Sequence, residues 1–241
     1  PLEDVDYESA NATPSGSFFT YIYLVALAEK KGARIGAIRG TNINDPIHAF
    51  IVYDTPEFPP EVARKANGDL IEFAIENTPK WHPCTPCGYD MREAGIDTMQ
   101  EIAFCLGTAI QYYSDTIRER GAKLDNLRPM VFSLDSESDF FETIAKFRAI
   151  RRMWAKIAKD RLGATSPHAM ACRIGARLAG NTMHSQKALN NTARATLEML
   201  AAVLGGAQSV DCCGIDEEFG LPSAESRIFE LDAQHIISHE A

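Results

Sequence analysis

The chain has 241 residues, of which 45% are hydrophobic and 24% charged, a composition typical of a globular protein, and its length fits one large domain or two small ones. Its net charge of −9 gives no electrostatic support for binding nucleic acid or an anionic membrane surface. No apolar run approaches the length of a membrane span, and the first residues lack the basic and apolar regions of a secretion signal. We therefore predict a soluble, cytoplasmic protein.

Short apolar or β-branched segments alternate along the chain with longer helical patterns. The predicted strands are 6–12, 34–42, 82–88, 129–135, 169–176 and 208–213. The predicted helices are 17–32, 70–79, 92–120, 139–163, 190–206 and 223–237. Pro83 and Pro86 cannot donate to a sheet, so the strand 82–88 rests mainly on its position between two helices.

Alternation of strand and helix on this scale indicates a parallel α/β fold. No glycine-rich phosphate loop follows the first strand, and polar residues recur after every strand. In a barrel, the loops that follow the strands converge on one face and build a single site. We predict an α/β fold of the TIM-barrel type, incomplete because about six βα units fall short of the eight that close a barrel.

Six cysteines occur, and Cys84 and Cys87 form a C-x-x-C pair. Such a pair can be half of a zinc site or a redox pair, but the adjacent Cys212 and Cys213 lack the spacing of a second half-site. The alternative is that these thiols pack as small hydrophobic groups, and we predict no metal site.

Several segments become recognisable when they are taken together. They are IRGTNIND, GYDMREAG followed by QEIAF, FETIAKFRA, FRAIRRMWAKI, AGNTMHSQKALNN and LAAVLGGAQS followed by DEEFGLP. In this order they resemble the substrate-binding barrel of methylmalonyl-CoA mutase and related acyl-CoA mutases. The resemblance implies that residues 1–241 form one partial barrel domain of an intramolecular transferase, an isomerase acting on acyl-CoA thioesters.

The family uses adenosylcobalamin, held by a separate domain with a DxHxxG motif, and no such motif occurs in these 241 residues. The resemblance therefore implies that the cofactor is bound mainly by a domain or subunit outside this chain. The expected partners are an acyl-CoA substrate and that cobalamin-binding domain or subunit. Open sheet edges also predict self-association.

The resemblance assigns roles to individual residues. Two catalytic residues are implied, Tyr89 and Asp90, in a GYD segment where relatives have GYH. The substrate-binding residues implied are Thr41, Ile43, Asn44, Lys65, Arg173 and Gln186. Glu217 matches a glutamate that contacts the adenosyl ribose of the cofactor.

Three of these positions depart from the family pattern. An ionised Asp90 can accept but not donate a hydrogen bond, so it cannot replace the family histidine that bonds the thioester carbonyl. Ile43 replaces a glutamine, and Lys65, beside Arg64, replaces the arginine that pairs with the carboxylate of methylmalonyl-CoA. These changes predict a substrate other than methylmalonyl-CoA.

Two alternative hypotheses about function stay open. The chain could be a catalytically silent CoA-binding or assembly subunit that keeps the fold. It could also be a cobalamin-independent enzyme that uses Asp90 and Glu93 as an acid–base pair, although an ion pair between Arg92 and Glu93 is the simpler expectation. Similarly, Asn44 and Asp45 could cap the next helix rather than bind a ligand.

Overall fold

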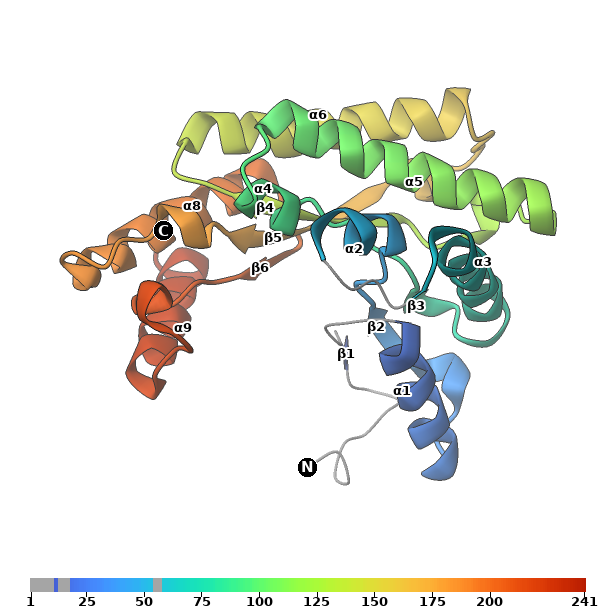
Figure 1. Cartoon of the computed structure of the whole chain (residues 1–241), viewed down its shortest axis with the longest axis horizontal. Coiled ribbons are helices and arrows are strands. Elements are labelled where there is room, and N and C mark those ends of the chain that lie inside the picture. Colours follow the sequence, from blue (N-terminus) through green and yellow to red (C-terminus); the bar gives the residue numbers. More distant parts are fainter. Residues whose placement is uncertain (1–10, 13–17, 54–57) are drawn as a thin grey trace. The chain divides into compact units, whose positions relative to one another are not determined.

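The computed structural model describes residues 11–12, 18–53 and 58–241 (Figure 1). The chain divides into two compact units, and we treat each separately. The first unit contains residues 1–87, 103–132 and 152–172, and the second contains 88–102, 133–151 and 173–241. Four elements contribute residues to both units: β4 (Met130–Ser136), α5 (Thr98–Arg120), α6 (Phe140–Asp160) and β5 (Cys172–Leu178), of which only Cys172 lies in the first unit.

The first unit contains a parallel three-stranded sheet in the order β1-β2-β3. Its strands are β1 (Asn11–Ala12), β2 (Arg39–Thr41) and β3 (Lys80–His82), and its other helices are α1 (Phe18–Lys30), α2 (Pro46–Val52), α3 (Pro60–Asn77) and α7 (Pro167–Met170). A core cluster joins α1 and α3 to the sheet: Tyr21, Val25, Ala28, Ile38, Leu70 and Trp81. The ring centroids of Tyr21 and Trp81 lie 5.2 Å apart.

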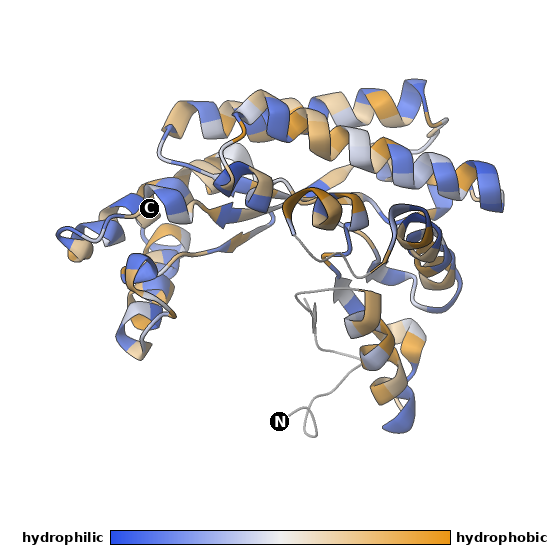
Figure 2. Cartoon of the chain, in the orientation of Figure 1, coloured by the Kyte–Doolittle hydropathy of each residue, from blue (hydrophilic) through white to orange (hydrophobic). Residues whose placement is uncertain are grey.

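The second unit contains a sheet in the order β4-β5-β6, in which β5 (Cys172–Leu178) and β6 (Ser209–Asp211) are parallel. Its other helices are α4 (Tyr89–Glu93), α8 (Asn191–Gly205) and α9 (Ala224–His239). One cluster packs β5 against α8 and α9: Leu178, Met183, Ala195, Met199, Cys213 and Ala233. In Figure 2, α5, α6, α8 and α9 all carry both hydrophobic and hydrophilic residues, as expected for helices with one buried side.

The parallel α/β class is confirmed, but the described strands form two three-stranded sheets rather than one continuous barrel wall. Several predicted strands also differ in extent. Residues 35–37 of the predicted strand 34–42 form a 3₁₀ turn, and of the predicted strand 6–12 only residues 11–12 are described. Of the predicted strand 82–88, only His82 lies in a strand and Cys87 in an isolated bridge, because Pro83 and Pro86 cannot continue the ladder.

Local side chains explain where other elements begin and end. The predicted helix 92–120 is broken at Gly95, whose φ of 102° requires glycine. The second part, α5, starts with a capping box in which Gln100 N–H donates to Asp97 Oδ1 (2.8 Å) and Asp97 N–H donates to Gln100 Oε1 (3.0 Å). Ser166 caps α7 through Ala169 N–H (3.2 Å), so the predicted strand 169–176 starts at Cys172 instead.

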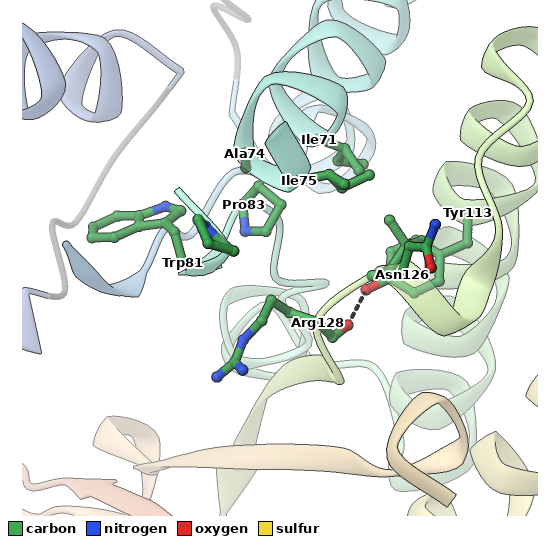
Figure 3. A pocket seen from close by; sticks show the side chains of 10 residues that line it. Ile71, Ala74, Ile75, Trp81, Pro83, Tyr113, Asn126 and Arg128 are labelled. Atoms are coloured by element: carbon green, nitrogen blue, oxygen red, sulfur yellow. Dashed lines mark hydrogen bonds between the residues drawn. The ribbon is translucent and has the colours of Figure 1, made fainter. Parts of the chain in front are cut away.

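Figure 3 shows a small pocket in the first unit, between α3, β3 and the segment that precedes β4. Its volume of about 20 Å³ is enough for one water molecule. The indole N–H of Trp81 is buried without a hydrogen-bond partner, and Tyr113 closes another side by donating to the carbonyl oxygen of Arg128 (3.0 Å).

Within the described ranges, no helix combines the length and apolar composition needed to cross a membrane.

Candidate functional site

Polar and charged side chains gather in the second unit around the carboxyl ends of β4, β5 and β6. In β5, alternate residues are buried against the helices, whereas Arg173, Gly175 and Arg177 lie on the opposite, more exposed face. Arg177 lies in register with Asp211 of β6, and Gly175 with Ser209. This face of the sheet is therefore polar and carries small side chains beside its charges.

Tyr89 begins α4 and contacts this face. The guanidinium carbon of Arg177 lies 5.1 Å from the centroid of the Tyr89 ring, a cation–π contact. Arg177 also holds Asp211, with Nε and Nη2 each 3.1 Å from Asp211 Oδ2. Burial, followed by the charge of Glu93, raises the pKa of the Tyr89 phenol, so it stays neutral and can donate a hydrogen bond.

Asp135, near the end of β4, is fully buried, and neither of its carboxyl oxygens has a hydrogen-bond partner. Burial raises its pKa to about 9, partly offset by the charge of Lys146. Asp135 is therefore a neutral acid near pH 7. Its backbone N–H donates to Glu101 Oε1 (2.8 Å), and Glu101 Oε2 forms a buried ion pair with Lys146 Nζ (2.7 Å).

Glu198 of α8 is a second buried acid in this unit. Its Oε1 accepts hydrogen bonds from Thr182 (2.6 Å) and Ser138 (3.0 Å), whereas its Oε2 has no partner. Burial raises the pKa of Glu198 to about 7, although both hydroxyl donors lower it. Glu198 can thus change its protonation state near neutral pH.

The charged residues of α4 have structural partners. Glu93 Oε1 accepts the backbone N–H of Gly180 (2.9 Å), and Oε2 accepts that of Asn181 (3.1 Å). Arg92 pairs with Glu137, with Nη2 2.6 Å from Oε2, so the expected Arg92–Glu93 ion pair was wrong. Glu93 therefore positions the loop after β5, which gives no support to Asp90 and Glu93 as an acid–base pair.

The other predicted residues of this unit lie in several elements. Asp90 is half-buried in α4, and Arg173 is exposed on β5. Gln186 is exposed in the loop between β5 and α8. Glu217 is exposed in the 3₁₀ turn Glu217–Phe219, and its Oε1 lies 3.6 Å from where a Cβ on Gly180 would stand.

The remaining predicted residues belong to the first unit. Thr41 ends β2, and Ile43 is half-buried in the loop that follows. Asn44 is buried, with its Nδ2 donating to Asn67 Oδ1 (2.7 Å). Lys65 is exposed on α3.

Asp45 has the capping role considered from the sequence. It is the N-cap of α2, with Oδ1 accepting from His48 N–H (3.1 Å). Tyr112 donates to the same oxygen (2.6 Å), and Cys87 N–H donates to Oδ2 (2.8 Å). One carboxylate therefore connects the β2–α2 loop, the segment after β3 and α5.

The Cys84 and Cys87 side chains are buried in the first unit, which agrees with packing as small hydrophobic groups. Burial raises the pKa of the Cys84 thiol, which disfavours the reactive thiolate. Sequence reasoning missed other groups, namely Arg177, Asp135 and Glu198. The available signal was the alternation of charged and apolar residues in CRIGARL, which we interpreted only as a strand.

Comparison with known proteins gives a consistent result. The model of the methylmalonyl-CoA mutase family matches residues 6–241. The large subunit of 2-hydroxyisobutanoyl-CoA mutase from Aquincola tertiaricarbonis is 34% identical over 100% of this chain and 43% of its own length. The methylmalonyl-CoA mutase of Escherichia coli (strain K12) is 32% identical over 98% of this chain and 33% of its own length. The human mitochondrial methylmalonyl-CoA mutase is 31% identical over 100% of this chain and 32% of its own length, so the chain spans less than half of each of these relatives.

Proposed function

Because the chain belongs to the methylmalonyl-CoA mutase family, we propose that it is the substrate-binding part of an adenosylcobalamin-dependent acyl-CoA mutase. Such an enzyme is an isomerase that moves a group within the carbon skeleton of an acyl-CoA thioester. The observation that carries the proposal is the family match over residues 6–241, which includes the polar strand ends around Tyr89. The proposal includes the TIM-barrel architecture of the family, to which the βα units of this chain would contribute.

Adenosylcobalamin, when bound, supplies the carbon radical that starts the rearrangement. Glu217 suits a contact with the adenosyl ribose, because its exposed carboxylate can accept hydrogen bonds from hydroxyl groups. Gly180 beside it has no side chain to crowd such a ligand. The family's DxHxxG motif does not occur in these 241 residues, so we propose that another domain or subunit holds most of the cofactor.

We propose a substrate that lacks the free carboxylate of methylmalonyl-CoA. Arg64 is paired with Asp115 (2.6 Å) and Glu119 (3.2 Å), and Lys65 cannot form the two parallel hydrogen bonds with which arginine reads a carboxylate. The similarity to a 2-hydroxyisobutanoyl-CoA mutase supports a short branched acyl group with a hydroxyl. We also propose that Tyr89 and Asp90 are catalytic residues and that the substrate-binding residues include Thr41, Ile43, Asn44, Arg173 and Gln186.

The name of that relative, a large subunit, supports assembly with a second subunit that carries the cobalamin-binding domain. Self-association is also proposed, because among the described residues each three-stranded sheet ends in strands that pair on one side within it. Light scattering of the purified chain tests this, and a monomer at all concentrations would contradict it.

The first experiment is thermal unfolding of the protein with a series of CoA thioesters, including 2-hydroxyisobutanoyl-CoA and methylmalonyl-CoA. A ligand that binds only the folded state stabilises it by about 2.7 kcal/mol at 100 times its Kd. We expect a clear shift with a hydroxyacyl-CoA and a smaller one with methylmalonyl-CoA. Absence of any shift with every thioester would refute the proposed function, and stabilisation without turnover by any reconstituted complex would favour the silent CoA-binding subunit.

A further inference from the structure

Arg177 occupies a position from which a cation can reach a ligand beside Tyr89. The exposed fraction of the Arg177 side chain is 32%, whereas Lys146 is buried. Arg177 lies on the polar face of β5. The guanidinium lies against the Tyr89 ring, and its Nε and Nη2 both contact Asp211 Oδ2, so two neighbours restrict the side chain. A guanidinium held in this way is pre-organised, so little side-chain entropy remains to be lost on binding a ligand.

The neighbouring residues on this face are small. Gly175 precedes Arg177 by two residues and therefore points to the same side of β5, and its partner across the sheet is Ser209. Neither residue has a side chain that would cover the guanidinium. The sheet surface next to Arg177 can therefore receive the acyl end of a ligand.

A thioester carbonyl oxygen is an acceptor and needs a donor to bind it. Asp90 cannot donate when ionised, Arg92 is paired with Glu137, and Lys146 is paired with Glu101. The donors that remain near this face are Arg177, Arg173 and the neutral Tyr89 phenol, and of these Arg177 is a cation held against the Tyr89 ring. A guanidinium has five N–H groups, of which those on Nε and Nη2 face Asp211 in Arg177, and a bond to a ligand carbonyl oxygen would use another of them. Its positive charge would also stabilise negative charge that develops on that oxygen during the reaction.

We propose that Arg177 is a substrate-binding residue that donates a hydrogen bond to the thioester carbonyl oxygen of the acyl-CoA. The inference rests on the proposed function, because it needs an acyl-CoA at the strand ends of the second unit. In this arrangement Asp211 is a positioning residue, which acts only through Arg177.

The test compares two ligands that differ only in the carbonyl group: isobutyryl-CoA and S-isobutyl-CoA, the thioether in which CH₂ replaces C=O. Their dissociation constants are measured by calorimetry with the purified wild-type protein, with Arg177→Met and with Arg173→Met as the matched control. Methionine keeps an unbranched stem against Tyr89 and removes every donor. We expect the wild type to prefer the thioester by about 10- to 100-fold, as for a hydrogen bond to a charged group.

Arg177→Met should reduce the ratio of the two dissociation constants to nearly one. Arg173→Met should weaken the binding of both ligands by a similar factor and leave that ratio unchanged. Arg177→Lys, which preserves the charge and is the milder change for folding, should retain only part of the preference. If Arg177→Met keeps the wild-type preference for the thioester, the inference is wrong while the proposed function stands. If the methionine variant does not fold, an unchanged preference in Arg177→Lys leads to the same conclusion. If neither ligand binds the wild type, the proposed function fails and the inference fails with it.

Discussion

Replacing Asp135 with asparagine should change how the stability of the protein depends on pH. The folded state holds this carboxyl neutral, with a pKa of about 9, because it is fully buried. In the unfolded chain its pKa is about 3.9. Since the folded pKa is the higher one, the contribution to stability is complete below about pH 4 and is lost as pH rises towards about 9.

The magnitude follows from the number of protons bound. Between about pH 5 and pH 7, Asp135 carries a proton in the folded state but not in the unfolded state, so stability falls by at most about 1.4 kcal/mol per pH unit. An asparagine at this position would have no proton to lose, and its amide keeps the shape of the acid. We therefore expect the free energy of unfolding of Asp135→Asn, relative to that of the wild type, to increase by up to about 2.7 kcal/mol between pH 5 and pH 7.

Urea unfolding followed by circular dichroism at several pH values measures this difference directly. Asp232→Asn is the control, because Asp232 is exposed on α9, and its difference from the wild type should stay constant with pH. The other titrating groups are common to both proteins, and those that do not interact with Asp135 cancel. A constant difference for Asp135→Asn as well would show that Asp135 is ionised in the folded protein, and the reasoning from its burial would be wrong.

Three other substitutions test the packing of the fold, each by urea unfolding. Lys146→Met leaves the Glu101 carboxylate buried without its cation and should lower the free energy of unfolding by about 3–5 kcal/mol. The double variant Lys146→Met with Glu101→Gln should recover part of this stability. Equal losses of stability in the single and double variants would contradict a buried ion pair. Tyr112→Phe removes the hydroxyl that donates to Asp45 and should cost about 1–3 kcal/mol, so a loss near zero would argue against that bond. Gly206→Ala forces alanine to a φ of 85° at the end of α8 and should cost about 1–2 kcal/mol, whereas a neutral result would place the helix end elsewhere.

The long helices could be predicted from the sequence because their signals are local and repeated. The predicted helix 139–163 corresponds to α6, Phe140–Asp160, and 190–206 corresponds to α8, Asn191–Gly205. Both have a sustained apolar period, and α8 ends at a glycine in the left-handed region. The break at Gly95 was missed although the sequence carried its signals, a glycine followed by the capping-box residues Asp97 and Gln100.

The strands were predicted less accurately for a physical reason. β2, β3 and β6 have three residues each, too few for an alternating pattern to be distinguished from a loop. Their limits depend on hydrogen bonds to strands far along the chain. The β3 partner of Arg39, for example, is Lys80, and no local pattern encodes that pairing.

The candidate site shows the same limit. The resemblance identified Tyr89, but the contact between its ring and Arg177 joins residues 88 positions apart and required the structure. Asp135 was noted only among the polar residues that follow the predicted strands, because an acid at the end of a strand is usually solvated. Its burial results from packing that only the folded second unit creates.

Asp45 shows why agreement with a family motif does not by itself identify a catalytic group. It belongs to the polar segment Thr41–Asp45, yet its carboxylate accepts three hydrogen bonds and caps α2. Removing it would leave buried donors unpaired, at a cost of about 1–3 kcal/mol for each, and would displace the loop that carries Ile43 and Asn44. Loss of activity on mutating Asp45 would therefore be expected even if it never contacts a substrate. A residue of this segment can be assigned to binding only when its replacement changes ligand affinity while the free energy of unfolding stays unchanged.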